Sequence, residues 1–323
     1  MDAVSTLPPL RVEYAHTGLE VLLAQPDVLA VIGFGRDAPA CADPRYQRVE
    51  LEPDLRPAPL EVWRSAGRIQ HGSDGMLRWS HSEDYAFVGI ELDERDFGGI
   101  AATTQAAYLR LGAWCRASAT PYLLRIWNYV DAINAGMGDA ERYRLFCSGR
   151  AAGMVGAASY PAASAIGLNA GGRLLQVCAL AARRPGTTVE NPRQVSAWRY
   201  PREYGPAAPN FARAMRAPTH SPQLYISGTA AVVGHASHHI GDVAAQLAET
   251  LTNLESLRMT AGDVAPFGDP RSPLRAYVRH AADAARVREA LLAQLGADTP
   301  LLVLRGDICR AELLVEIDGL LNA

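Results

Sequence analysis

The chain has 323 residues, of which 49% are hydrophobic, and it carries a formal net charge of −3. This length allows two globular domains of ordinary size, and the weak charge argues against nucleic acid or an anionic membrane as a partner. No segment has the roughly 18 consecutive apolar residues of a membrane span, and the N-terminus lacks a secretory pattern. We therefore expect a cytoplasmic protein that acts on a small molecule.

All 31 basic residues are arginine, because the sequence contains no lysine. Schiff-base catalysis, a phosphate-binding loop lysine and a pyridoxal-phosphate anchor all need a lysine amine, so these three enzyme classes are excluded. Guanidinium groups bind carboxylates in a planar, two-point geometry. The cysteines are scattered without a C-x-x-C pair, and we expect free thiols at Cys41, Cys115, Cys147, Cys178 and Cys309.

The first hundred residues predict short β-strands separated by Pro, Gly and Asp. The strand-like segments are LRVEY (10–14), VLAVIGF (28–34), PLEVWRS (59–65), MLRWSHS (76–82) and YAFVGIEL (85–92). The apolar spacing then changes to that of a helix from Gly98 to Ala117, and a strand follows Pro121. Asp139 is a good N-cap residue for a further helix over 140–157.

The second half repeats this alternation of strands and helices. After a strand at 173–182, residues 188–217 are rich in proline, arginine and aromatic residues, which predicts an ordered loop that lines a site. The remaining expected elements are strands at 223–227, 274–279, 301–306 and 312–318 and helices at 242–258 and 281–295. We predict an α+β fold of two packed modules, 1–150 and 151–323, with mixed sheets covered by helices and most of the active site in the second module.

Two motifs resemble known ligand sites without meeting their requirements. The glycines in VLAVIGFGRDAPA (28–40) imitate a dinucleotide fingerprint, but prolines interrupt the helix that would bind the pyrophosphate. His235, His238 and His239 lie close together, but Asp242, their nearest acidic neighbour, is where a helix N-cap is needed. We therefore interpret the glycines as turn residues and the histidines as structural, and we expect no metal and no cofactor.

A nucleophile is equally hard to place, because the sequence has no G-x-S-x-G motif and Cys147 falls within a helical pattern. The arginines and aromatic residues that share segments are more informative. They are Arg125, Arg142, Arg150, Arg193, Arg202 and Arg213 with Trp127, Tyr129, Tyr143, Trp198, Tyr200, Tyr204 and Phe211. As a group they predict a pocket for a planar dianion, in which guanidinium groups bind carboxylates and phenols donate hydrogen bonds.

Glu316 lies between Val315 and Ile317 in the C-terminal strand-like segment CRAELLVEIDG (309–319). The period of two directs its side chain to the face opposite both neighbours. A carboxylate on an otherwise apolar strand is either a charge at the rim of the sheet or an acid-base group with a raised pKa, and the pattern alone leaves both open.

Five blocks together resemble the chorismatases, enzymes that remove pyruvate from chorismate. In chain order they are LRIWNYVDAIN (124–134), ERYRLFCSGR (141–150), ENPRQVSAWRYPREYGPAAPNFARA (190–214), LYISGTAAVVGH (224–235) and DICRAELLVEIDG (307–319). The last hundred residues also resemble the small enamine/imine deaminases of the YjgF-like fold. Chorismatases are built from such α+β modules, so the two resemblances agree.

The resemblance implies roles for several residues. Glu316 would be the acid-base group beside the enolpyruvyl ether, and Arg150, Arg213, Tyr200 and Tyr204 would hold the two carboxylates of chorismate. Gly228, Ala230, Ala231 and Gly234 would be small because the substrate ring passes close to them.

The resemblance leaves more than one product open. Cys309, seven positions before Glu316, matches a cysteine of the 3-hydroxybenzoate producers, whereas Ala231 stands where those producers tend to have glycine. We favour a hydroxybenzoate, with the 3-hydroxy isomer ahead of the 4-hydroxy isomer. Hydrolysis to a dihydroxycyclohexadiene acid is the alternative, as is an imine deaminase or ligand-binding protein on the same scaffold. The oligomeric state, monomer or homo-oligomer, stays open.

Overall fold

The computed structural model describes residues 6–154, 159–168, 171 and 173–322. Its N-terminal part forms a four-stranded sheet in which β2 and β3 are parallel and the other neighbours antiparallel. The strand order is β1 (Arg11–Ala15), β5 (Leu60–Arg64), β2 (Val28–Phe34) and β3 (Tyr46–Val49), and the short helix α1 (Leu19–Leu23) packs beside β2.

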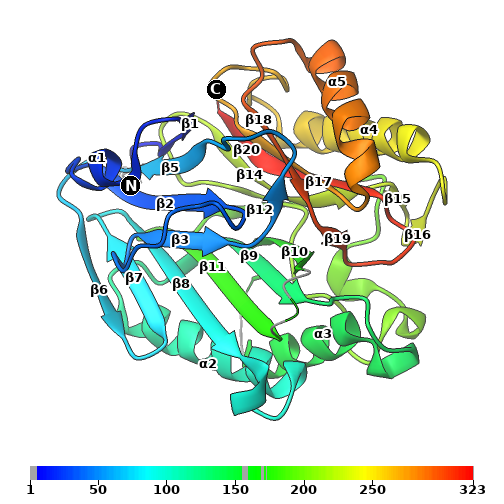
Figure 1. The fold of residues 1–323 in the computed structure, drawn as a ribbon, viewed down its shortest axis with the longest axis horizontal. Helices are drawn as coiled ribbons and strands as arrows, with labels where there is room; N and C mark the ends of the chain where they lie inside the picture. The colour runs from blue at the N-terminus through cyan, green and yellow to red at the C-terminus, as the bar shows by residue number, and fades with distance from the viewer. Residues whose placement is uncertain (1–5, 155–158, 169–170, 172, 323) are drawn as a thin grey trace, which may run out of the picture.

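A seven-stranded mixed sheet occupies the middle of the chain. Its order is β19 (Asp307–Ile308), β10 (Ala162–Leu168), β9 (Tyr122–Asp131), β11 (Leu174–Ala182), β8 (Tyr85–Asp93), β7 (Leu77–His81) and β6 (Gln70–Asp74). The helices α2 (Ile100–Ala117) and α3 (Arg142–Gly153) cover its outer face, at the bottom of Figure 1.

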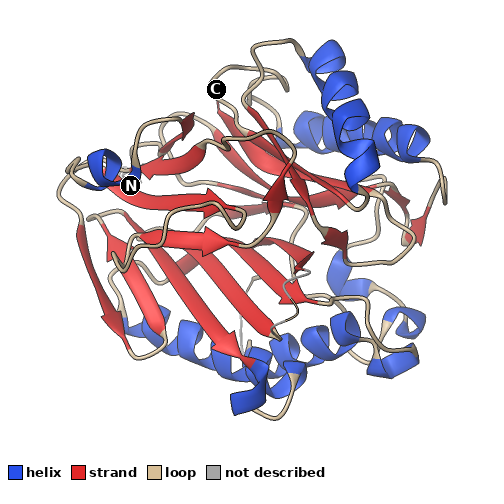
Figure 2. Cartoon of the chain, viewed as in Figure 1, coloured by secondary structure: helices blue, strands red, loops and turns tan. Residues whose placement is uncertain are grey.

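A second seven-stranded mixed sheet contains most of the C-terminal part. Its order is β12 (Thr187–Val189), β13 (Ala214–Arg216), β14 (Gln223–Ala230), β20 (Val315–Asn322), β17 (Leu274–Val278), β18 (Leu301–Arg305) and β4 (Glu52–Pro53). The helices α4 (Val243–Ala261) and α5 (Ala284–Leu295) lie on its outer side, away from α2 and α3 (Figure 2).

Short elements complete the connections. The strands β15 (Val232–Val233) and β16 (Ala236–Ser237) form a small hairpin after β14, and the 3₁₀ turns are η1 (Glu94–Asp96), η2 (Gly138–Ala140), η3 (Ala197–Arg199), η4 (Arg202–Tyr204) and η5 (Ala281–Asp283). Two of the turns, η3 and η4, lie in the predicted loop 188–217, which is ordered.

The hydrophobic residues form separate cores on the two faces of each large sheet. One core lies under α2 and α3, and another lies under α4 and α5. A third lies between the inner faces and is rich in aromatic residues, including Trp63, Phe87, Trp127 and Tyr225. The Trp63 and Trp127 rings pack edge to face with centroids 5.5 Å apart. The α+β fold with sheets covered by helices is therefore confirmed.

Some local predictions are wrong. Asp139 does not cap a helix, because α3 begins at Arg142 after Glu141 and no side chain caps it. The Asp139 carboxylate instead accepts hydrogen bonds from Arg202. Asp242 does cap α4, through the backbone N–H groups of Ala244 and Ala245. The end of the predicted helix, residues 155–157, lies outside the described residues.

Residue 150, the expected boundary between modules, lies within α3. The sheet covered by α3 takes strands from both sides of that position, since β9 precedes it and β10 and β11 follow it. We propose that the division of the chain falls after β11, near Ala182, where the chain passes to the second large sheet. No helix within the described ranges is long and apolar enough to cross a membrane.

Candidate active site

Strand alternation in β20 places Glu316 in the interior. Val315 and Ile317 pack into the core beneath α4 and α5, so Glu316 and Asp318 point to the opposite face. Glu316 is 4% exposed and lies opposite Ala230 of β14 in the strand register. It belongs to the wall of a cavity and not to the rim of the sheet.

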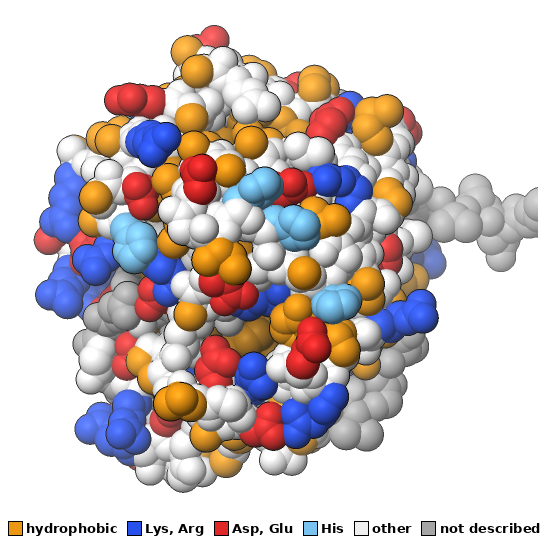
Figure 3. All heavy atoms as spheres, turned by 90° about the vertical axis from the view of Figure 1, so that its right-hand side faces the viewer, with side chains coloured by type: hydrophobic (Ala, Val, Ile, Leu, Met, Phe, Trp, Pro, Cys, Tyr) orange, Lys and Arg blue, Asp and Glu red, His pale blue; other side chains and the backbone are white. Residues whose placement is uncertain are grey.

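The cavity containing Glu316 has a volume of about 400 Å³. Four parts of the chain form its walls: residues 134–144, residues 194–213, the strands β14 and β15, and residues 309–316. The face of the molecule that carries these elements is hollowed, with hydrophobic side chains visible inside and acidic and basic side chains around the rim (Figure 3). Residues of β14 and β20 in the second large sheet thus converge on one site with residues of α3, β15 and the connecting segments.

Gly228 makes room for the Glu316 side chain. A Cβ atom at position 228 would overlap Glu316 Oε1 and would lie 3.2 Å from Ser164 Oγ. Glycine is therefore needed because the carboxyl group passes over this backbone position. Gly228 also lines the cavity, so the proximity to the substrate ring that the resemblance implies stays a prediction.

The surroundings of Glu316 favour its protonated form. Burial is the largest cause that raises its pKa, and the negative charge of Asp318 raises it further. Arg125 and Arg213 act in the opposite direction, and the pKa settles at about 8. No side chain in the described part of the chain forms a hydrogen bond with the Glu316 carboxyl group. Near neutral pH this group is a buried acid with a proton to donate.

Cys309 lines the same cavity. Burial, followed by the charge of Glu316, raises the pKa of its thiol to about 12. The side chain is therefore a neutral thiol at physiological pH, which is suited to shaping the cavity and unsuited to nucleophilic attack.

Arg213 presents a guanidinium group with unused hydrogen-bonding capacity. Its Nη2 donates to Tyr200 Oη at 2.7 Å and to the Val195 carbonyl at 2.8 Å, while its buried Nε has no partner in the described structure. The residue is 5% exposed and lines the cavity. A buried, unpaired N–H group costs free energy unless a ligand satisfies it.

Arg310 is a second such group, and the sequence analysis missed it. Its guanidinium carbon lies 4.1 Å from the centre of the Tyr204 ring and 5.2 Å from that of Tyr200. Nη1 donates to the His235 carbonyl at 2.8 Å and to Ser237 Oγ at 3.1 Å. The feature of the sequence that could have indicated Arg310 is its position directly after Cys309, within one of the five blocks that resemble the chorismatases. Across the residues that the structure describes, neither Arg310 nor Arg213 forms an ion pair with a carboxylate.

The predicted arginine cluster does not form as one pocket. Of its six members only Arg213 lines the cavity with Glu316. Four others are paired with carboxylates of the protein: Arg125 with Asp318, Arg142 with Glu94, Arg193 with Glu249, and Arg202 with Asp139. Tyr200 and Tyr204, in contrast, lie in the cavity wall as predicted from the loop.

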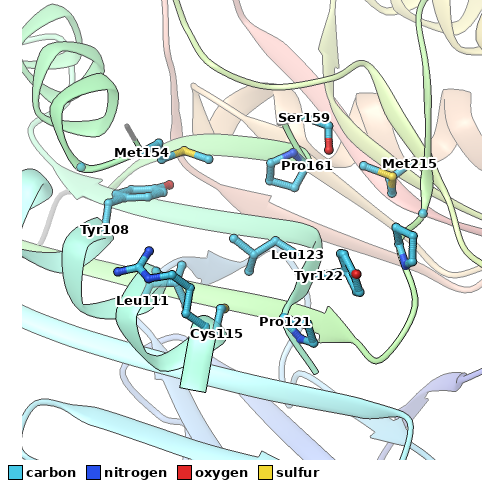
Figure 4. Close-up of a pocket in the computed structure, with 15 residues that line it drawn as sticks. Tyr108, Leu111, Cys115, Pro121, Tyr122, Leu123, Met154, Ser159, Pro161 and Met215 are labelled. Carbon is cyan, nitrogen blue, oxygen red and sulfur yellow. The ribbon is translucent and has the colours of Figure 1, made fainter. Parts of the chain in front are cut away.

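Arg150 lies outside this cavity, on α3. Its guanidinium carbon is 5.1 Å from the centre of the Tyr108 ring, and its Nε contacts Met154 Sδ at 3.5 Å. Tyr108 and Met154 border a second cavity, of about 300 Å³, between α2, β9 and the segment before β10 (Figure 4). The structure therefore does not bring Arg150 together with Glu316.

Ala231 is also absent from the cavity wall. It is fully buried in the core between the sheets, whereas Ala230 and Val232 on either side of it line the cavity. The residue opposite Glu316 is thus Ala230 and not Ala231.

The histidines of the hairpin region make contacts within the protein. His235 Nδ1 lies 3.1 Å from Tyr204 Oη, and His239 Nε2 lies 3.2 Å from Glu249 Oε2. Among the described residues, no group of three or more His, Cys, Asp or Glu side chains is arranged to hold a metal ion. His235 instead helps to fix a tyrosine at the cavity mouth.

Known proteins are similar to this chain in sequence and in fold. Residues 61–181 match the family model described as chorismatase FkbO/Hyg5-like, N-terminal. A 3-hydroxybenzoate synthase of Streptomyces hygroscopicus is 33% identical over 318 residues, covering 91% of each chain. The chain belongs to the chorismatase family.

Other chorismatases are also similar to this chain. One from Streptomyces rapamycinicus is 37% identical over 80% of this chain and 81% of its own. A chorismatase crystal structure is 32% identical and superposes with a TM-score of 0.83, covering 99% of this chain and all of that one. YjgF-family proteins are among the partial matches, such as one from Mycobacterium tuberculosis that covers 35% of the chain at a TM-score of 0.28.

Proposed function

We propose that this protein cleaves the enolpyruvyl ether of chorismate and releases pyruvate and 3-hydroxybenzoate. The observation that carries the proposal is the position of Glu316, a buried acid with a pKa of about 8, in a cavity that also contains the unpaired guanidinium groups of Arg213 and Arg310. Membership of the chorismatase family and the similarity to a 3-hydroxybenzoate synthase support the choice of substrate and product.

The cavity suits a small dianion. Chorismate carries one carboxylate on its ring and one on the enolpyruvyl group, and the cavity offers two guanidinium groups without carboxylate partners in the described part of the protein. We assign Arg213 and Arg310 to these carboxylates in place of Arg150. Tyr200 and Tyr204 supply aromatic faces and hydroxyl groups beside the two arginines.

Glu316 starts the reaction as a general acid. It donates its proton to the terminal methylene carbon of the enolpyruvyl group, which produces an oxocarbenium ion. The carboxylate left on Glu316 stabilises this cation electrostatically. Cleavage of the bond between the ring carbon and the ether oxygen then releases the side chain as pyruvate. As this bond breaks, the oxygen of the C4 hydroxyl group bonds to ring carbon C3 and its proton passes to the Glu316 carboxylate, which leaves a C3–C4 epoxide on the ring. Opening of the C4–O bond and transfer of the C3 hydrogen to the oxygen as a proton then make the ring aromatic with its hydroxyl group on C3, so 3-hydroxybenzoate forms and no water is consumed.

The neutral thiol of Cys309 faces the same space and is assigned to steering the ring intermediate. Its presence supports a hydroxybenzoate product over the dihydroxycyclohexadiene acid, which requires water to add.

Incubation of the purified protein with chorismate, followed by mass analysis of the products, tests the proposal. Hydroxybenzoate and pyruvate together equal chorismate in mass, whereas the diene acid and pyruvate exceed it by one water. Chromatography against the 3-hydroxy and 4-hydroxy standards identifies the isomer. Chorismate left intact while 2-aminoacrylate is consumed would overturn the proposal in favour of a deaminase.

A further inference from the structure

Two buried ion pairs connect the second large sheet to its neighbours: one joins β20 to β9 of the first large sheet, and the other joins β17 to β5 of the four-stranded sheet. Arg125 and Asp318 are 2.7 Å apart, with side chains 1% and 2% exposed. Arg275 and Glu61 form the other pair, with both side chains 3% exposed. None of the four lines the cavity. A buried ion pair is seldom more stable than apolar residues of the same volume, so a role other than stability is expected for at least one of them.

Asp318 is held rigidly beside Glu316. The two residues are separated by one position on β20, so their side chains lie on the same face of the strand. Asp318 Oδ2 accepts hydrogen bonds from Arg125 Nη2 at 2.7 Å, Ser164 Oγ at 2.6 Å and Tyr277 Oη at 3.1 Å. These donors come from three different strands, β9, β10 and β17. The carboxylate therefore cannot turn away from Glu316 without breaking contacts to all three.

The charges of the buried cluster already balance without Glu316, because two guanidinium groups face two carboxylates. Ionisation of Glu316 would add a further negative charge beside Asp318, which Arg125 and Arg213 offset only in part. The charged and titratable groups that face Glu316 are Asp318 on its own strand, Arg125 on β9, Arg213 directly before β13, Tyr277 on β17 and Cys309 before β20. Glu141, Glu203 and Glu312 line the same cavity.

We propose that Asp318 is a positioning residue that keeps Glu316 in its acid form, so that the buried Arg125–Asp318 pair sets the pH range in which the enzyme works. This inference rests on the proposed function, because it takes Glu316 as the proton donor. Arg125 has a double role in this arrangement, since it fixes Asp318 in place and limits the effect of its charge.

The direction of the effect follows from the charges. Glu316 works in its protonated form, so turnover falls as the pH rises through its pKa of about 8. Asp318 raises that pKa, and loss of its negative charge lowers it. The alkaline limb of the pH profile then moves to lower pH, while relative activity below pH 6 is retained.

The test is the pH profile of pyruvate release from chorismate between pH 5 and 10. We expect Asp318→Asn to move the alkaline limb of kcat down by about one pH unit or more. Glu61→Gln is the matched control, because it also removes a buried carboxylate and leaves an arginine unpaired, and Glu61 is not among the groups that shift Glu316. We expect it to lower the melting temperature and leave the alkaline limb in place.

Tyr277→Phe provides a second variant that retains every charge of the cluster. It removes one hydrogen-bond donor from Asp318, so the negative charge there is less well stabilised and acts more strongly on Glu316. We expect the alkaline limb to move the opposite way, up by a few tenths of a pH unit. The inference is overturned if Tyr277→Phe and every folded Asp318 variant keep the limb of the unmodified enzyme, or if Glu61→Gln moves it as far as Asp318→Asn.

The proposed function and the role of Asp318 are distinguished by different outcomes. If the unmodified protein does not consume chorismate, the proposed function itself is wrong. If it consumes chorismate with an alkaline limb near pH 8 that Asp318→Asn and Tyr277→Phe do not move, only the role of Asp318 is wrong.

Discussion

The cavities beside β20 and beside α2 differ in chemistry far more than in size. The one beside β20 has a volume of about 400 Å³ and contains a buried acid and two guanidinium groups without carboxylate partners among the described residues. The one beside α2 has about 300 Å³, and Arg116 is the only charged side chain among its described lining residues. Volume alone would not separate them. Convergent polar groups left unsatisfied by the protein distinguish the site prepared for a ligand.

The strongest test of this contrast is Glu316→Gln. Glutamine has nearly the same shape as the protonated acid, so chorismate should still bind, but no proton can be donated. We expect kcat to fall about 10²- to 10⁴-fold, the usual contribution of general acid catalysis. Pyruvate release measures turnover, and calorimetric titration with chorismate measures binding. Turnover equal to that of the unmodified enzyme would remove Glu316 from the mechanism.

The next largest effects are expected at the two arginines of the cavity. Arg213→Gln and Arg310→Gln should each lower kcat/KM about 10- to 100-fold, mostly through KM, because each removes a charge-assisted hydrogen bond to a carboxylate. Arg202→Gln is the matched control, since Arg202 is 64% exposed and paired with Asp139 at the surface. An equal loss in the control would show that general charge attraction, and not local binding, is responsible.

Cys309 should affect the product more than the rate. In the Cys309→Ala variant, the space left by the thiol lets water reach the intermediate, so the diene acid should increase relative to 3-hydroxybenzoate by about tenfold, the selectivity that one small group in a pocket supplies. Mass analysis separates the two products by one water. Cys147→Ala, at a buried thiol of α3 outside the cavity wall, is the control and should leave the product ratio unchanged.

The elements of this fold were largely predictable, because strand and helix periodicities are local. The position of Glu316 on the inner face of β20 followed from the period of two, and the same rule would have placed Asp318 beside it. The partners of the arginines were not predictable. Arg125 meets Asp318 across 193 positions in the sequence, so the packing of the two sheets decides which guanidinium groups are paired and which are left for a ligand.

Ala231 shows that the register between two strands could not be predicted from the sequence. The pairing of β14 with β20 shifts between Ile226 and Thr229, where β14 contains one residue more than its partner. Such a bulge sits next to Gly228 and redirects the residues that follow. The sequence shows a run of small residues from Gly228 to Ala231 but does not show which of them face the acid. The structure assigns that position to Gly228 and Ala230.

Arg150 gives the smallest expected effect on activity and the sharpest contrast with Arg213. Both are buried arginines over aromatic rings, but Arg150 packs on Tyr108 near the second cavity. Arg150→Gln should lower the melting temperature by a few degrees, because a cation–π contact of about 1 to 2 kcal/mol is lost. KM for chorismate should stay within about twofold, since no binding contact is removed. A rise in KM like that of Arg213→Gln would instead mean that Arg150 reaches the substrate, and the two cavities would then have to be treated as one site.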